Sequence, residues 1–153
     1  MEYGSIEREF QVEASPEVVF EVLSSPEHVR EWWGAEAELE PTAGAPGELA
    51  WGRGTPHAHI VPLTVVDADP PRTFAFRWAY SDGEVPSPTN SFLVRFELTP
   101  SGAGTVVRLI ETGFRERGWE AAVLEAQYEE HRQGWDTHLG GLRRYLTRLV
   151  TTR

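Results

Sequence analysis

Residues 119–149 read WEAAVLEAQYEEHRQGWDTHLGGLRRYLTRL and contain no proline. Apolar side chains recur in this stretch at steps of three, four or seven residues, which predicts one apolar face on an α-helix. A helix of about 31 residues is about 46 Å long, whereas a compact chain of this size has a radius of gyration of about 15 Å. The helix must therefore cross the whole molecule and needs one long partner surface. Its apolar residues are Leu124, Tyr128, Trp135, Leu139, Leu142, Leu146 and Leu149.

The partner surface is predicted from three strands that precede the helix. Apolar and polar residues alternate over Phe74–Tyr80 and again over Phe92–Leu98, which is typical of half-buried strands. A turn at Ser101–Gly104 leads into a third strand, Val107–Glu111. We expect an antiparallel meander with a strongly aromatic face that packs against the helix. That face would carry Phe74, Phe76, Trp78, Tyr80, Phe92, Val94, Phe96 and Leu98.

The N-terminal part predicts one strand followed by two short helices. Residues Ser5–Val12 alternate between apolar and polar side chains, as in a half-buried strand. The tripeptide Ser-Pro-Glu then occurs at 15–17 and again at 25–27, each time before an apolar group. Serine can cap the first amides of a helix, proline suits its first position, and glutamate suits its positive end.

The middle of the chain is rich in glycine and proline, which excludes a helix there. We expect short strands near Glu36–Glu40 and Glu48–Gly52. The segment His57–Asp67 is rich in β-branched residues but contains Pro62. Because proline cannot donate a ladder hydrogen bond, this segment fits an edge strand or a bulge better than a central strand.

Composition excludes several classes of function. The 153 residues suggest one domain, residues 1–153. The net charge of −10 disfavours nucleic acids and anionic membrane surfaces as partners. The chain has no cysteine and no lysine, since its 14 basic residues are all arginine, so disulfides, thiolate nucleophiles and Schiff-base chemistry are excluded. No apolar run is long enough to insert into a membrane and no signal peptide is evident, which predicts a cytoplasmic protein.

Five stretches are spread in order over nearly the whole chain. They are ASPEVVF (14–20), WWG (32–34), DPPRTFAFRW (69–78), GTVVRL (104–109) through TGF (112–114), and GW (134–135) through LGGL (139–142) to YL (145–146). Together they resemble the helix-grip fold of the START and pollen-allergen-like (SRPBCC) superfamily, and within it the branch named for the activator of the 90-kDa heat-shock protein ATPase. The resemblance implies an α+β fold in which a curved antiparallel sheet wraps around the long C-terminal helix. It also implies binding of apolar small molecules between sheet and helix, where a few members, such as polyketide cyclases, do chemistry.

Aromatic residues are the candidate walls of a ligand cavity in such a fold. Six tryptophans are many for a chain of 153 residues, and a concave sheet under one helix leaves space for a ligand. The alternative is that the same rings fill the core, as aromatic side chains commonly do. The candidate ligand-binding residues are Trp33, Trp51, Phe76, Trp78, Phe92, Phe96, Tyr128 and Trp135.

Three residues are candidates for polar contacts or catalysis. Glu111 has the parity of the inward residues of its strand, and a buried carboxylate suits acid–base work. Alternatively Thr112 and Gly113 signal a turn, the strand has ended, and Glu111 reaches solvent or an arginine such as Arg115 or Arg117. The other two candidates are His59 and His131.

Histidine spacing gives only a weak hint of a metal. His57 and His59 share one strand face, and His28 or His131 would have to supply a third ligand. No metal and no cofactor are therefore expected. His131 and His138 lie seven residues apart, on one helix face, where they would flank Trp135.

Three glycines interrupt the long helix at Gly134, Gly140 and Gly141, and each costs about 1 kcal/mol relative to alanine. Close packing against a strand, room for a ligand, or a kink at the glycine pair would each explain them.

Three functions remain open at this point. The first is binding of a small hydrophobic or amphipathic ligand between sheet and helix. The second is a cyclase-like or hydratase-like enzyme that uses a buried carboxylate and a histidine. The third is a stress-response module that interacts with a chaperone, and a homodimer is equally open.

Overall fold

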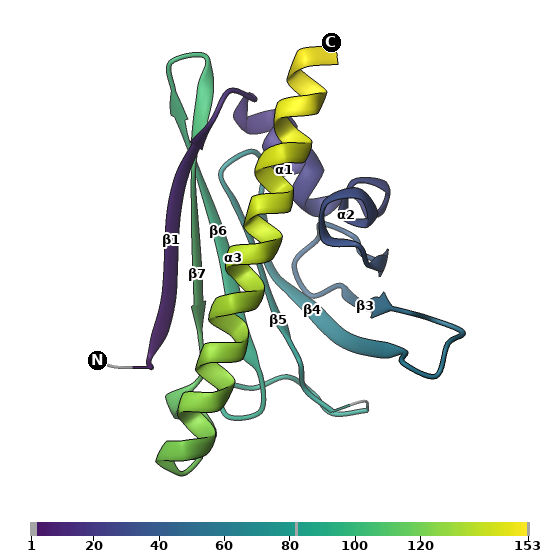
Figure 1. The fold of residues 1–153 in the computed structure, drawn as a ribbon, viewed down its shortest axis with the longest axis vertical. Coiled ribbons are helices and arrows are strands. Elements are labelled where there is room, and N and C mark those ends of the chain that lie inside the picture. Colours follow the sequence, from purple (N-terminus) through teal and green to yellow (C-terminus); the bar gives the residue numbers. More distant parts are fainter. Residues whose placement is uncertain (1–2, 82, 153) are drawn as a thin grey trace.

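In the computed structural model the described residues, 3–81 and 83–152, form one antiparallel sheet of seven strands, crossed by a long helix (Figure 1). The strand order is β1-β7-β6-β5-β4-β3-β2, and the sheet curves around the helix, as the helix-grip fold requires. The strands are β1 (Ser5–Val12), β2 (Glu36–Glu38), β3 (Pro46–Trp51), β4 (His59–Asp69), β5 (Thr73–Trp78), β6 (Phe92–Ser101) and β7 (Gly104–Thr112). The helices are α1 (Pro16–Ser24), α2 (Pro26–Trp33), the short 3-10 helix η1 (Arg115–Arg117) and α3 (Ala121–Thr152).

The two Ser-Pro-Glu motifs open α1 and α2 as predicted, but only the first serine caps with its side chain. Ser15 Oγ accepts from Val18 N at 3.3 Å, and Pro16 occupies the first turn. Ser25 makes no such bond, and it also ends α1, where its own N–H donates to the carbonyl of Glu21. The two helices therefore follow each other without a linker.

The edge position predicted for the segment with Pro62 is wrong. β4 lies inside the sheet, between β3 and β5, and Pro62 pairs with Glu48. The Pro62 carbonyl accepts from Ala79 N, one residue past the end of β5. In an antiparallel ladder the N–H and C=O of one residue point to the same neighbouring strand. The N–H that Pro62 lacks would therefore face Ala79, just beyond the last residue of β5, so no hydrogen bond within the β4–β5 ladder is lost. The predicted bulge exists, but between Val65 and Asp67.

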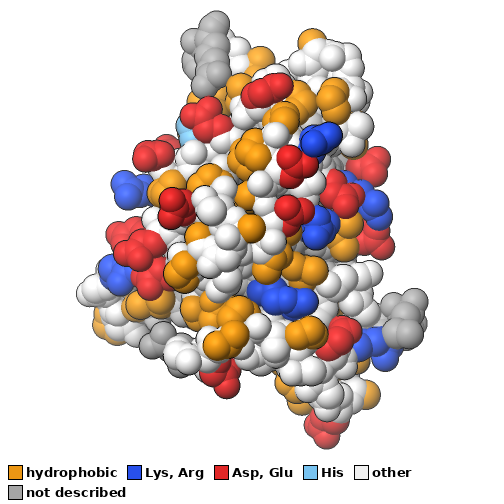
Figure 2. Space-filling view, turned by 180° about the vertical axis from the view of Figure 1, so that it is seen from behind, with side chains coloured by type: hydrophobic (Ala, Val, Ile, Leu, Met, Phe, Trp, Pro, Cys, Tyr) orange, Lys and Arg blue, Asp and Glu red, His pale blue; other side chains and the backbone are white. Residues whose placement is uncertain are grey.

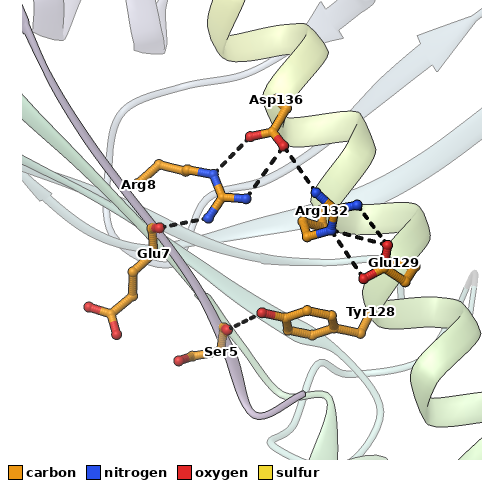
Figure 3. A network of polar contacts seen from close by, with 7 residues as sticks. All are labelled: Ser5, Glu7, Arg8, Tyr128, Glu129, Arg132 and Asp136. Atoms are coloured by element: carbon orange, nitrogen blue, oxygen red, sulfur yellow. Dashed lines mark hydrogen bonds and ion pairs between the residues drawn. The ribbon is translucent and has the colours of Figure 1, made fainter. Parts of the chain in front are cut away.

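Polar contacts tie α3 to the edge strand β1 (Figure 3). Arg8 Nε donates to Asp136 Oδ1 at 2.8 Å, and Arg132 pairs with the same carboxylate at 3.5 Å. Nearer the N-terminal end of α3, Tyr128 Oη donates to the carbonyl of Ser5 at 2.9 Å. Arg8, which interrupts the apolar face of β1, is thus one of the residues that position the helix.

Charged side chains of both signs lie among apolar ones on the far face of the sheet (Figure 2). One ion pair joins β6 to β4, with Arg95 Nη1 at 3.2 Å from Asp67 Oδ2. Such exposed pairs contribute about 0–1 kcal/mol each. None of the described helices combines the length and the apolar character needed to cross a membrane.

Gly141 marks the closest approach of α3 to α2. A Cβ atom there would lie 2.8 Å from the carbonyl oxygen of Trp32, whereas at Gly140 the nearest atom is the mobile guanidinium of Arg144 at 3.4 Å. Gly141→Ala is therefore expected to lower the free energy of unfolding by about 1–3 kcal/mol through overpacking, despite the better helix propensity of alanine. Gly140→Ala is the matched control and should be neutral or stabilising in urea unfolding. Equal effects of the two substitutions would contradict this explanation.

Candidate functional site

A cavity of about 370 Å³ lies between α3 and the sheet, beside the C-terminal end of α2. This volume is within the usual range of small-molecule sites, about 300–1,000 Å³. The cavity is only partly closed, so a ligand has a path from solvent. Its lining residues are Trp33, Trp51, His59, Val61, Trp78, Ala79, Glu130, His131, Gly134, Trp135 and His138.

Four tryptophans form the apolar walls. The Trp33 ring is central, with its centroid 5.3 Å from that of Trp135, 5.5 Å from that of Trp78 and 6.0 Å from that of Trp51. Three of these indoles donate their N–H groups within the protein: Trp51 to the carbonyl of Trp33, and Trp78 and Trp135 to Glu111. Because those polar edges are engaged, the tryptophans present mainly ring surface to a ligand.

Glu111 is a buried carboxylate behind the cavity wall, with an exposed fraction of 0%. Its Oε2 accepts from Trp78 Nε1, and its Oε1 accepts from Trp135 Nε1, both at 2.8 Å. The alternative that the strand ends before Glu111 is wrong, because β7 continues to Thr112 and Glu111 pairs with Ile6 and Val94.

The arginines considered as partners of Glu111 lie elsewhere. Arg117 donates to the carbonyl of Ala79, and its guanidinium packs over the rings of Phe92 and Trp119. Burial lowers the pKa of Arg117 from its ordinary value. Arg115 begins η1, three residues after the end of β7.

His131 completes the polar group around Glu111. Its Nδ1 lies 2.8 Å from Glu111 Oε1, and its side chain lines the cavity with an exposed fraction of 16%. His59 lies on β4 at the exposed rim, with its ring centroid 5.9 Å from that of Trp51. The structure therefore brings Glu111 and His131 into direct contact and leaves His59 apart at the rim.

His138 lies one helical turn beyond Trp135, with its ring centroid 5.9 Å from that of Trp33. Burial lowers the pKa of His138 below its ordinary value of 6.5. Below pH 6.5 His138 is therefore protonated in the unfolded chain but still neutral in the folded protein. Because the unfolded state binds the extra proton, the free energy of unfolding falls as pH falls from 6.5 toward the lowered pKa. We expect His138→Gln to flatten the fall in stability below pH 6.5 in urea unfolding at several pH values. An unchanged difference between pH 7.5 and pH 5.5 would contradict this expectation.

The histidines weighed as metal ligands are scattered. His28 Nδ1 is bonded to Tyr145 Oη at 2.6 Å, at the other end of α3, and His57 lies in an exposed turn. Within the described ranges no three histidine, aspartate or glutamate side chains gather as a metal site would require.

Four of the candidate wall residues do not line the cavity. Phe76 lies behind Trp33 and Trp78, and Phe96 packs edge-on against Trp135. Phe92 is covered by Phe114 and His131. Tyr128 packs on Phe114 and bonds Ser5. Of the eight candidates, Trp33, Trp51, Trp78 and Trp135 are the ones that line the cavity.

The sequence analysis missed three lining residues: Val61, Ala79 and Glu130. Glu130 was within reach, because positions 130, 134 and 138 follow one another at steps of four on α3. Val61 shares the parity of the buried Leu63. Ala79 gave no signal, since its φ of +66° breaks the strand alternation and such values are rare for residues other than glycine.

A second hollow, of about 660 Å³, lies between α2 and the C-terminal half of α3, away from all the candidate residues. It is open, and charged side chains are among its lining residues. Its lining is Glu31, Trp32, Gly141, Arg143, Arg144, Thr147 and Arg148.

Solved structures confirm the fold. The chain is similar to protein MLL2253 from Mesorhizobium loti, with a TM-score of 0.75 and 20% identity over 94% of this chain and 97% of that one. It is also similar to the Aha1 dimer from Colwellia psychrerythraea, with a TM-score of 0.71 and 20% identity over 93% and 95%. A third similar structure is DynU16, a putative protein in the dynemicin biosynthetic locus, with a TM-score of 0.73 and 22% identity over 94% of this chain. This chain spans 47% of DynU16.

No curated protein matches the chain. Residues 13–147 match the family model described as "Activator of Hsp90 ATPase homolog 1-like protein". That range includes both short helices, six of the seven strands and most of α3. The chain therefore belongs to the family of Activator of Hsp90 ATPase homolog 1-like proteins.

Proposed function

We propose that this protein binds a hydrophobic or amphipathic small molecule in the cavity between the sheet and α3. The observation that carries the proposal is the cavity of about 370 Å³ walled by four indoles. Gly134 supports the proposal. This residue lines the cavity, and a Cβ atom added to it would meet no protein atom within 4 Å. A glycine in mid-helix that packs against nothing is explained by room for a ligand.

Titration with N-phenyl-1-naphthylamine, read through tryptophan fluorescence, tests this proposal. The dye has no charge, and its two ring systems suit indole walls. At about 0.3 kcal/mol per heavy atom we expect saturable quenching with a dissociation constant of about 200 µM or tighter. Val85→Ser is the control, since Val85 is 83% exposed and lies outside the cavity. Quenching that does not saturate, or that Val85→Ser weakens, would contradict the proposal.

A second candidate is an acid–base enzyme, and the contact between Glu111 and His131 favours it. A histidine that lines a cavity and is oriented by a buried carboxylate has the arrangement of a general base. The reaction class would be proton abstraction next to a carbonyl group, as in a cyclisation or dehydration.

Exchange of the α-protons of 2-tetralone in D2O, followed by NMR, tests the second candidate. The protein should accelerate the exchange, and His131→Asn should abolish the acceleration while dye binding persists. A rate equal to that of buffer would remove this candidate and leave the binding proposal standing.

Two partners follow from the comparisons as further proposals. The family description suggests a chaperone, and the Aha1 dimer suggests a second copy of this chain. Co-purification from the native cytoplasm tests the first, and light scattering at several protein concentrations tests the second.

A further inference from the structure

The polar atoms of the cavity that remain available to a ligand are few. Among the described residues, a buried side-chain nitrogen or oxygen without a hydrogen-bond partner is found at Arg117 Nε. His131 Nε2 and Trp33 Nε1 also have no hydrogen-bond partner within the described part of the chain. They are not among the buried atoms, so each is accessible from outside the packed core. Both side chains line the cavity.

The contact with Glu111 fixes what His131 can offer. The indoles of Trp78 and Trp135 only donate, so both oxygens of Glu111 accept, as those of an ionised carboxylate do. An ionised Glu111 has no proton to donate, so His131 Nδ1 is then the donor to Oε1 and a neutral imidazole accepts at Nε2. The cavity thus presents one acceptor at His131 and one donor at Trp33.

The charge of the cavity disfavours an anionic ligand. No arginine lines it, and the chain contains no lysine. Its carboxylates are Glu130 in the lining and Glu111 directly behind it. A ligand carboxylate would lose its hydration and find no cation in return.

We infer that the cavity takes an uncharged, planar aromatic ligand whose hydroxyl group donates to His131 Nε2. This inference rests on the proposed binding function. The indole faces supply the apolar contact for the ring, and Trp33 Nε1 can donate to an oxygen of the ligand. A ligand that carries a carboxylate into the cavity is disfavoured by the carboxylates of Glu130 and Glu111.

Calorimetric titration with 2-naphthol, 2-methoxynaphthalene and 2-naphthoate tests the inference at pH 7.5. One hydrogen bond to the imidazole should make 2-naphthol bind about tenfold more tightly than the methyl ether. Burial alone would give the opposite order, because the ether has an extra methyl group. 2-Naphthoate should bind at least about tenfold more weakly than 2-naphthol.

His131→Asn is the decisive variant, because its amide nitrogen can still donate to Glu111 while Nε2 is removed. The preference for 2-naphthol over the ether should fall to about twofold or less. His57→Asn, the same substitution at an exposed position outside the cavity, should keep the full preference. Should His131→Asn fail to fold, the three wild-type titrations still decide.

The outcomes distinguish failure of this inference from failure of the proposed binding function. If the ether binds as tightly as 2-naphthol, or 2-naphthoate binds best, this inference is overturned while the cavity remains a binding site. If His131→Asn keeps the preference, the hydroxyl partner is another residue and the inference is also wrong. If none of the three compounds nor the dye binds, the proposed function itself fails.

Discussion

Glu111→Gln is expected to lower the free energy of unfolding by about 2 kcal/mol or more, although the two side chains have the same shape. The carboxylate accepts one indole N–H on each oxygen, from Trp78 and from Trp135. Glutamine has one accepting oxygen and one donating NH2 group. Whichever way the amide turns, its NH2 group faces an indole that can only donate. On the side of Trp135 water cannot compensate, because Glu111 is 0% and Trp135 only 2% exposed.

Neutralising Glu111 also removes the cost of burying a charge, which opposes this loss. We expect the loss of hydrogen bonds to outweigh this gain. The wild-type carboxylate has three hydrogen-bond partners, whereas in the variant the buried NH2 group of glutamine would face an indole N–H, and neither group can accept. Urea unfolding followed by circular dichroism measures the change without relying on the tryptophans. Glu130→Gln is the matched control, at an exposed position on the rim of the cavity, and should change stability by less than about 0.5 kcal/mol. A Glu111→Gln variant as stable as the wild type would show that the carboxylate does not hold the indoles.

The long helix and the meander were predictable because each depends on one periodicity repeated many times. The apolar steps between Leu124 and Leu149 and the alternation over Phe92–Leu98 survive local exceptions, and the structure confirms both elements. Single residues were harder to place. Pro62 indicated an edge strand, yet it is tolerated inside the sheet because the neighbouring strand ends beside it.

Glu111 shows how two correct signals can conflict. Its parity with Leu109 indicated the interior, whereas Thr112 and Gly113 indicated a turn. Both are right: β7 ends at Thr112, and Gly113 has a φ of +112°, one residue too late to turn Glu111 outward. A sequence pattern locates a turn only within a residue or two, and one residue decides whether a carboxylate is buried.

Which aromatic residues line the cavity and which fill the core could not be predicted from the sequence, for a different reason. Phe92 and Trp78 both belong to the aromatic face of the sheet, so alternation treats them alike. What separates them is which side chain covers them: the His131 ring lies 4.4 Å from that of Phe92, whereas Trp78 borders the cavity. Room for a ligand was one of the explanations open for the three helix glycines, and the sequence did not tell Gly134, where a Cβ atom would meet no protein atom within 4 Å, from Gly141, where it would meet the Trp32 carbonyl.

Gly134→Leu is accordingly expected to weaken binding of N-phenyl-1-naphthylamine at least about tenfold while the protein remains as stable as the wild type or becomes more stable. Leucine has a better helix propensity than glycine by somewhat less than 1 kcal/mol. Its Cβ atom would meet no protein atom within 4 Å, and the rest of the side chain would extend into the cavity of about 370 Å³, so we expect no overpacking. The space that it occupies is then lost to the dye.

Gly134→Ala is the matched control, because it adds a single carbon to the same place. It should raise the free energy of unfolding by about 1 kcal/mol and weaken the dye much less than leucine does. Reduced stability of Gly134→Leu would show that the cavity is too small for added side chains, and unchanged dye affinity would place the dye elsewhere. A ligand-sized space beside α3 explains why Gly134→Leu would weaken dye binding without lowering the stability of the fold. At Gly141, two turns along the same helix, even the methyl group of alanine would lower stability, because α2 already occupies the space.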